Sequence, residues 1–332
     1  MITSRAITLR RREFLRFAGI AAAGLAAPRI ASAQAYPARP VRVIVPFTPG
    51  GPTDLFARLI AAKLSQQMGQ QFYIENVGGA GGNIGAGRAA QAAPDGYTIL
   101  VDGGNYVINP SLFAEIPYDP IKSFDPVTIS VTSPVLLTVN PSVPAHTVKE
   151  LVDLINANPN KYGYASPATG TPPDLVGELF RLSLKLDLVH VPFKGGGEAL
   201  AAVLGGQPAI SFGAIAPAVP LVRAGKLRAI AVTGKARMHT LPDVPTMTEA
   251  GFPQIDGETW FNVVVPAGTP KDIIARLHAE VAKAVAEPDV KQRLDVLGYV
   301  PISSTPEEAT ARFKSDAAKW AKVIRDAGMK AQ

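Results

Sequence analysis

The sequence predicts an α/β protein built from two successive strand–helix series. In each series, short β-branched strands alternate with helical patterns, and this order is typical of parallel sheets. The strands of the first series end in glycine-rich loops. A length of 332 residues allows one large domain or two lobes. We therefore expect an α/β fold with two lobes, each a mainly parallel sheet flanked by helices.

The stretch at residues 41–54 organises the first series. A β-branched run at residues 41–45 predicts a buried strand, and after Gly50 and Gly51 the apolar spacing predicts a helix. Such a loop directs free backbone N–H groups and the positive end of a helix dipole at one spot, which suits a carboxylate. Thr53 or Asp54 could instead only cap the helix.

Two further strands, at residues 71–77 and 97–101, complete this series. Glycine-rich loops follow them at residues 78–87 and 102–105. In open α/β sheets, ligands bind beyond the carboxyl ends of the strands, so three loops should converge there. Residues 85–90 also fit the loose dinucleotide pattern G-x-G-x-x-A, but the glycines begin seven positions earlier, which places Gly85 and Gly87 inside a helix start.

The second series follows a proline-rich passage. We expect the chain to cross between lobes near residues 132–134, between strands at 127–131 and 135–139. Further strands are expected at 162–166, 188–192, 209–213, 227–232 and 260–266, and helices at 147–157, 174–184, 198–204, 270–286 and 306–327. A capping-box pattern, Thr147 with Glu150, marks the first of these helices.

Candidate ligand contacts also lie at strand ends of the second series. Ser166 and Thr171 offer hydroxyl groups, although turn chemistry with the neighbouring prolines explains them equally well. Phe193 offers an aromatic wall and Lys194 a cation, which could also be a solvated surface lysine. Ser166 has no G-x-S-x-G frame, so the sequence does not favour a hydrolase nucleophile.

The first 33 residues are typical of a cleaved export signal. A basic start precedes an apolar run that is too short to span a bilayer, and Ala31-Ser32-Ala33 has the form of a cleavage site. Residues 11–16 resemble the twin-arginine signal, which exports folded proteins. An ordinary secretory signal or a membrane anchor are the alternatives.

Removal of this segment changes the charge balance. The segment holds six arginines and one glutamate, so 33 − 6 = 27 basic and 27 − 1 = 26 acidic residues remain, a net charge of +1. The basic pI therefore gives no support for nucleic-acid binding. The absence of cysteine excludes disulfides and thiolate metal sites, and the four histidines are scattered, so we expect no metal site. Because the dinucleotide pattern at residues 85–90 fits only loosely, we expect no cofactor either.

Seven motifs in order resemble the substrate-binding receptors of tripartite tricarboxylate transporters, also called the Bug family. They span nearly all of the chain after residue 33, at residues 40–58, 75–85, 94–98, 191–195, 224–232, 241–251 and 260–270. The resemblance implies a two-lobed periplasmic binding protein of type II-like fold, with a ligand cleft between lobe 1 (34–132 and 234–332) and lobe 2 (133–233).

The resemblance also implies a function: capture of a small organic carboxylate in the periplasm and its delivery to a two-component membrane permease. Such a receptor would be a monomer and not an enzyme. Lobe 1 would hold one carboxylate largely through backbone N–H groups, and lobe 2 would hold the distal end. The implied ligand-binding residues are Phe47, Gly50, Gly51, Thr53, Asp54, Ala80, Gly81, Gly82, Asn83, Asn105, Ser166, Thr169, Gly170, Thr171, Phe193 and Lys194.

Three departures from the family pattern concern the distal end. Asp174 stands where His is common, Phe193 where Tyr is usual, and Pro208-Ala209 replaces Val-Asp. A less polar distal end favours an aromatic or long-chain carboxylate, or a monoacid, over citrate. Two rival functions remain open at this point: an exported periplasmic enzyme with a bound nucleotide cofactor, and a receptor that hands its ligand to a signalling partner.

Overall fold

The computed structural model describes residues 36–330. The fold below is that of the compact unit that begins at Arg39. The predicted export signal, with its twin arginines and its cleavage site near Ala33, lies outside the described residues. None of the described helices combines the length and the apolar content that a membrane span requires.

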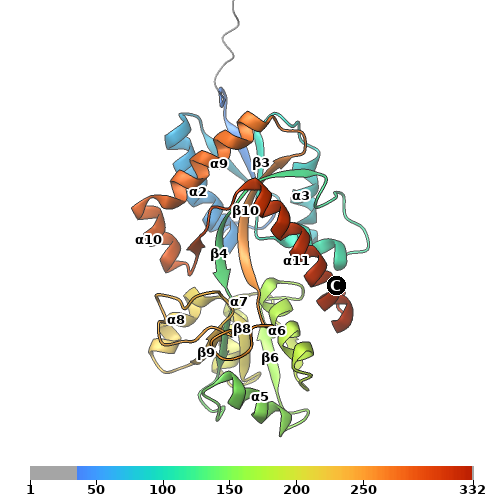
Figure 1. Ribbon diagram of the computed structural model, residues 1–332, viewed down its shortest axis with the longest axis vertical. Helices are drawn as coiled ribbons and strands as arrows, with labels where there is room; N and C mark the ends of the chain where they lie inside the picture. The colour runs from blue at the N-terminus through green and yellow to red at the C-terminus, as the bar shows by residue number, and fades with distance from the viewer. Residues whose placement is uncertain (1–35, 331–332) are drawn as a thin grey trace, which may run out of the picture. The chain divides into compact units, whose positions relative to one another are not determined.

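The first of two sheets has six strands in the order β11-β4-β10-β3-β1-β2 (Figure 1). β1 lies between β2 and β3 and is parallel to both, with Val43 opposite Ile74 and Ile99. The predicted strand–helix series at its start is therefore confirmed. The strands are β1 (Val41–Val45), β2 (Phe72–Asn76), β3 (Thr98–Asp102), β4 (Phe124–Pro134), β10 (Glu258–Pro266) and β11 (Val300–Pro301).

The other half of this sheet is antiparallel, so the expectation of a mainly parallel sheet is wrong for that half. β10 runs antiparallel to β3 and to β4, and β11 runs antiparallel to β4. The reason is the chain path: β4 leaves this sheet toward the second one, and β10 returns from it. A returning strand enters from the opposite end and must run against its neighbours.

The second sheet has five strands in the order β7-β6-β8-β5-β9 and is also mixed. β6 is parallel to β7 and β8, whereas β5 is antiparallel to β8 and β9. Only Val135 separates β4 from β5, so the expected crossing segment 132–134 is the end of a strand and not a loop. The strands are β5 (Leu136–Val139), β6 (Gly163–Ser166), β7 (Val189–Pro192), β8 (Ile210–Gly213) and β9 (Arg228–Val232).

Helices accompany both sheets. With the first sheet lie α2 (Pro52–Met68), α3 (Asn83–Ala90), α4 (Asn105–Ile108), α9 (Lys271–Ala286), α10 (Pro288–Val296) and α11 (Pro306–Ala327). With the second sheet lie α5 (Val148–Asn156), α6 (Pro172–Ser183), α7 (Gly196–Leu204) and α8 (Ile215–Arg223). Two short 3₁₀ turns, Ala80–Gly82 and Asn109–Ser111, belong to the site.

The last helix, α11, packs on elements of both sheets. Phe313 in its first half stacks on Trp260 of β10, in a buried cluster with Tyr106. Trp320 in its second half joins the buried cluster of the second sheet, which includes Phe180 of α6. Figure 1 shows the helix running from the first group of elements to α6. Trp260 is thus a core residue.

Candidate functional site

A cavity of about 470 Å³ lies where the loops of the two sheets meet. One side comes from the loops after β1, β2 and β3, and the other from the loops after β6 and β7. Lys194 is the only lining residue with a formal charge. The lining consists of Phe47, Gly81, Asn105, Asn109, Leu112, Phe113, Ala168, Thr169, Gly170, Thr171, Pro192, Phe193 and Lys194.

Half of the sixteen predicted site residues line this cavity. These are Phe47, Gly81, Asn105, Thr169, Gly170, Thr171, Phe193 and Lys194. The others lie in these loops or in the adjoining ends of helices and strands without lining the cavity: Gly50, Gly51, Thr53, Asp54, Ala80, Gly82, Asn83 and Ser166. The lining residues that the sequence did not point to are Asn109, Leu112, Phe113, Ala168 and Pro192. No motif marked the segment 109–113, which enters the cavity because α4 and the following turn fold back over the second loop.

The first loop, residues 46–51, is fixed by a buried aspartate. Gly50 has a left-handed φ of 86°, which glycine adopts without strain, and its N–H donates to Asp54 Oδ2 at 2.9 Å. Asp54 is 1% exposed and also accepts from Arg58 Nε at 2.8 Å and from Asn76 Nδ2 at 2.9 Å. The Asp54 carboxylate is therefore fully occupied in holding the loop, which lines the cavity through Phe47.

The second loop, residues 77–83, has an unusual backbone. Gly79, Ala80, Gly81 and Gly82 all have positive φ values, which turns the chain sharply into α3. Asn109 braces this turn, because its Nδ2 donates to Gly81 O at 3.0 Å and to Asn83 Oδ1 at 2.7 Å. The Asn83 side chain is buried and accepts a further bond from Tyr118, so it supports the loop from inside.

The dinucleotide interpretation of residues 85–90 loses its basis here. Gly85 and Gly87 lie inside α3, as the spacing indicated. A Cβ on Gly85 would lie 2.6 Å from Val77 O, and one on Gly87 would lie 2.5 Å from Pro117 Cγ. Both glycines permit close packing of the helix and do not form a phosphate-binding turn.

The third loop, residues 102–105, contains a buried acid behind the lining residue Asn105. Asp102 is 1% exposed. Burial raises the pKa of Asp102 to about 7, and the backbone N–H groups of residues 103–106 only partly offset this. Asp102 therefore titrates near neutral pH rather than in the usual range of a carboxylic acid.

This shift predicts how stability depends on pH. Below pH 3.8 Asp102 is protonated in both the folded and the unfolded chain, and between 3.8 and about 7 only the folded chain keeps the proton. The stabilisation that protonation provides is thus complete at low pH and is lost as the pH rises to 7, by about 1.4 kcal/mol per pH unit. In Asp102→Asn, we expect the slope of the unfolding free energy against pH to be smaller by about 1.4 kcal/mol per pH unit below pH 7. Urea unfolding at pH 5, 6, 7 and 8 measures this slope. An equal loss of stability at every pH would contradict the assignment.

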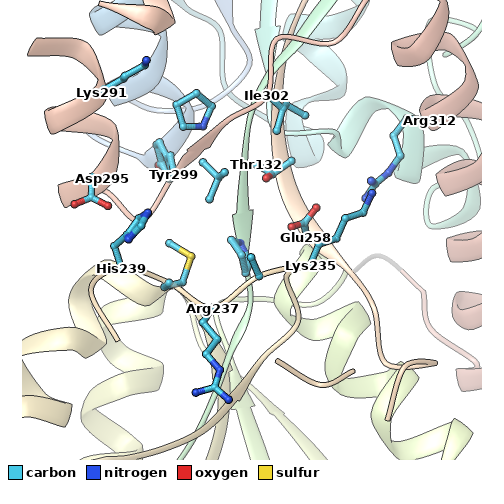
Figure 2. A pocket seen from close by; sticks show the side chains of 15 residues that line it. Thr132, Lys235, Arg237, His239, Glu258, Lys291, Asp295, Tyr299, Ile302 and Arg312 are labelled. Atoms are coloured by element: carbon cyan, nitrogen blue, oxygen red, sulfur yellow. The ribbon is translucent and has the colours of Figure 1, made fainter. Parts of the chain in front are cut away.

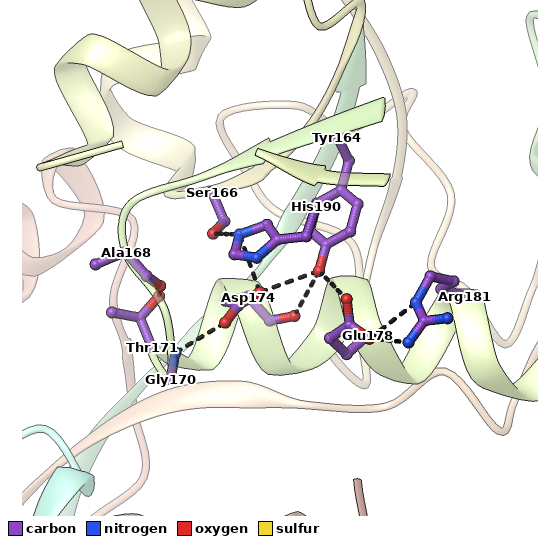
Figure 3. A network of polar contacts seen from close by, with 9 residues as sticks. All are labelled: Tyr164, Ser166, Ala168, Gly170, Thr171, Asp174, Glu178, Arg181 and His190. Carbon is purple, nitrogen blue, oxygen red and sulfur yellow. Dashed lines mark hydrogen bonds and ion pairs between the residues drawn. The ribbon is translucent and has the colours of Figure 1, made fainter. Parts of the chain in front are cut away.

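The fourth loop, residues 166–171, rests on a buried polar network (Figure 3). Gly170 N donates to Asp174 Oδ2 at 2.8 Å, and Asp174 Oδ1 lies 3.1 Å from His190 Nε2. Ser166 is fully buried with its Oγ 2.7 Å from the same His190 nitrogen, so its hydroxyl belongs to the network and not to the cavity. The loop therefore contributes Ala168, Thr169, Gly170 and Thr171 to the cavity, and Asp174 holds it from behind through Gly170.

The same network contains the one set of potential metal ligands found in the described part of the chain. Ligand atoms of Asp174, Glu178 and His190 lie within 4.8 Å of one another. Each is already engaged: Asp174 by Gly170, Glu178 by two bonds from Arg181 at 2.6 and 2.9 Å, and His190 by Ser166. We interpret the set as a hydrogen-bonded support for the fourth loop.

A larger cavity of about 610 Å³ lies elsewhere, beside β11 and the chain that connects β9 to β10 (Figure 2). It contains none of the predicted site residues. Its two arginines are paired, Arg237 with Glu249 and Arg312 with Asp316, both at 2.8 Å. The lining also holds two lysines, Lys235 and Lys291, and two acids, Glu258 and Asp295. Their formal charges balance in number, so this cavity has no excess charge that would select a ligand.

Comparison with known proteins identifies the family. Residues 56–329 match the family of tripartite tricarboxylate transporter receptors, TctC. The chain is 35% identical to BugT of Bordetella pertussis over 313 residues, which cover 94% of this chain and 95% of BugT.

Solved structures agree. The periplasmic binding protein BugD is 33% identical, with a TM-score of 0.74 over 90% of this chain and 100% of BugD. A protein of R. palustris solved with adipate is 34% identical, with a TM-score of 0.77 over 89% of this chain and 99% of that one. MatC of Rhodopseudomonas palustris with bound malate is 36% identical, with a TM-score of 0.73 over 87% of this chain and 100% of MatC.

These relatives and structures cover 87–94% of the chain. The two mixed α/β sheets therefore form a periplasmic binding protein fold. The matching family consists of solute-binding receptors and not of enzymes. The chain belongs to the tripartite tricarboxylate transporter receptor family, TctC.

Proposed function

We propose that this protein binds a small organic carboxylate in the cavity between the five site loops and delivers it to a two-component membrane permease. The observation that carries the proposal is the lining itself, in which one cation, Lys194, accompanies Gly81 and Gly170 and the polar side chains of Asn105, Asn109, Thr169 and Thr171. The adipate and malate complexes of the two relatives support this class of ligand. A micromolar receptor needs only about −8 kcal/mol, which a few backbone donors and one lysine can supply.

The lining also favours some carboxylates over others. Phe47, Leu112, Phe113 and Phe193 form its apolar part, and Lys194 is its single charged group. A tricarboxylate would place more negative charge in the cavity than one lysine can balance, and apolar side chains cannot solvate the excess. We therefore favour an aromatic or long-chain carboxylate over citrate.

The remaining parts of the proposal concern location and partners. We propose that the receptor works as a monomer in the periplasm, after removal of residues 1–33. Lobe 1 would comprise residues 34–132 and 234–332, and lobe 2 residues 133–233. Closure of the lobes about the segments that join β4 to β5 and β9 to β10 would then signal a bound ligand to the permease.

A thermal-shift panel tests the ligand class. Benzoate, adipate, malate and citrate are compared at equal concentration and ionic strength. We expect adipate or benzoate to raise the melting temperature more than citrate does, since a ligand that binds only the folded state stabilises it. Stronger stabilisation by citrate would refute the preference. Native mass spectrometry of freshly purified protein would expose a bound nucleotide, the finding that favours the enzyme alternative.

A further inference from the structure

The five-residue motif Gly-x-Pro-x-Asp occurs three times in the chain. At residues 268–272, before α9, the Gly268 N–H donates to Asp125 and not to the aspartate of its own motif. The other two copies form the entry to α2 at residues 50–54 and the entry to α6 at residues 170–174. In both, the glycine has a left-handed φ, 86° at Gly50 and 79° at Gly170. In both, the proline opens the helix, and the glycine N–H donates to the aspartate Oδ2, at 2.9 and 2.8 Å. The two helix entries are thus built alike.

The surroundings of the two aspartates differ. Burial alone would raise the pKa of Asp54, but hydrogen bonds from Arg58, Gly50 and Asn76 hold it below the usual value. Asp174 has no cation of this kind beside it. Burial raises the pKa of Asp174 to about 7, and its bonds from Gly170 and Tyr164 only partly oppose this. The first motif is therefore ionised throughout the neutral range, whereas the second titrates within it.

The groups around Asp174 are all identified. On α6 lies Glu178, which is neutralised by Arg181. On β6, the Tyr164 hydroxyl lies 3.0 Å from Asp174 Oδ1 and 2.8 Å from Glu178 Oε1, and it can donate to only one of them at a time. On β7, burial lowers the pKa of His190, against the opposing effect of Glu178. A neutral histidine therefore faces Asp174 at 3.1 Å.

β8, β10 and α11 also pack against α6. β8 has no charged residue, and the charges of β10 and α11 are directed elsewhere. Arg312 pairs with Asp316, and Lys319 pairs with Asp256. Glu258 interacts with Arg312 and Lys235. Among the described residues, the state of Asp174 is therefore set by its own network on α6, β6 and β7.

We infer that Asp174 is a positioning residue that holds the fourth loop through Gly170 when ionised and releases it in part when protonated. A carboxylate accepts a stronger N–H bond than a neutral acid does, by roughly a factor of two in energy. On protonation, the acid can donate to His190 Nε2. Its oxygen is then a weaker acceptor for the Gly170 N–H group. Because Gly170 and Thr171 line the cavity, ligand affinity should fall as the pH falls from 8 to 6, while the Asp54 motif stays unchanged.

The loop response can be measured without any ligand. In protein labelled with ¹⁵N-glycine, we expect the Gly170 amide resonance to shift with a midpoint between pH 6 and 8 and the Gly50 resonance to stay constant. In Asp174→Asn the Gly170 shift should be absent, whereas in His190→Gln it should persist. A constant Gly170 resonance in the wild type, or a shift that survives in Asp174→Asn, overturns the inference. If a variant does not fold, the titration of the Gly170 and Gly50 resonances in the wild type still tests the inference.

The binding experiment uses adipate, whose two carboxylic acids have ordinary pKa values and are mostly ionised at pH 6 and above. We expect the Kd of the wild type to rise by about three- to tenfold from pH 8 to pH 6 and that of Asp174→Asn to change by less than about twofold. Equal pH dependence in both would refute the role of Asp174. This experiment rests on the proposed function: absence of adipate binding at pH 8 counts against that function, and the amide titration decides the inference independently.

Discussion

Asp54→Ala is expected to lower the unfolding free energy by about 2–4 kcal/mol and ligand affinity by at least tenfold. The substitution removes one acceptor from three donors at once: Gly50 N, Arg58 Nε and Asn76 Nδ2. Arg58 is half exposed, so water can rehydrate it and the loss stays below that of a fully buried pair. The first loop would then lose the bond that fixes Gly50. Asn76, which donates to both Asp54 and Phe47 O, would lose one of these acceptors, so Phe47 would be held less firmly where it lines the cavity.

Two matched variants separate these effects. Asp54→Asn keeps an acceptor for Gly50 without the charge, so it should retain more affinity than the alanine variant. Asp119→Ala removes an aspartate that also holds backbone N–H groups, those of Ile121 and Lys122, but in a turn that does not line the cavity. Urea unfolding and calorimetric titration measure both quantities. If Asp119→Ala lowered affinity as much as Asp54→Ala, the loss could not be assigned to the first loop.

Lys194→Glu is expected to reduce the affinity for a dicarboxylate by at least about 30-fold, and Lys194→Met by about tenfold. Lys194 is the single formal charge in the cavity lining, so its reversal places like charges next to each other. The lysine is exposed, which limits its contribution and makes it sensitive to salt. We expect the wild-type affinity to fall with ionic strength more steeply than that of the methionine variant.

Lys226→Glu is the control for this charge change. Lys226 is exposed and does not line the cavity. Titration calorimetry at two salt concentrations should find its affinity within about twofold of the wild type, because exposed charges beyond a Debye length are screened. A Lys194→Glu variant that binds as well as Lys226→Glu would remove Lys194 from the site.

The sequence predicted those parts of the fold that depend on local pattern. The helices at residues 270–286 and 306–327 were expected within one residue of their observed bounds, because their apolar spacing and flanking prolines are strong signals. α8 and α10 were not expected. α8 contains Pro217 and Pro220, which obscure a helical pattern, and α10 follows α9 after a single residue, so its start did not stand out.

The antiparallel strands escaped prediction for a different reason. Whether β10 runs with or against β3 depends on the return of the chain from the second sheet, and no local pattern records that path. In the site, the glycine loops were predictable because each follows a strand. The wall at Leu112 and Phe113 was not, since it depends on how the segment after α4 folds over Gly81.

Asp174 illustrates the limit most clearly. In the sequence it appeared only as a departure from a family pattern, yet in the fold it joins the fourth loop to His190 and Tyr164. Its partners lie 4, 16 and 10 positions away in the sequence and meet only when β6, β7 and α6 pack together. The charge state of a buried group depends on that packing and cannot be obtained from residue type.

Calorimetric titration of the wild-type protein with adipate and with its uncharged diamide tests the central claim most directly. The two ligands have the same length and differ in charge, so the comparison isolates recognition of the carboxylate. We predict one adipate per chain with a Kd in the micromolar range, about −8 kcal/mol, and no detectable binding of the diamide. Equal binding of both ligands, or binding of neither adipate nor any other acid of the panel, would contradict the account.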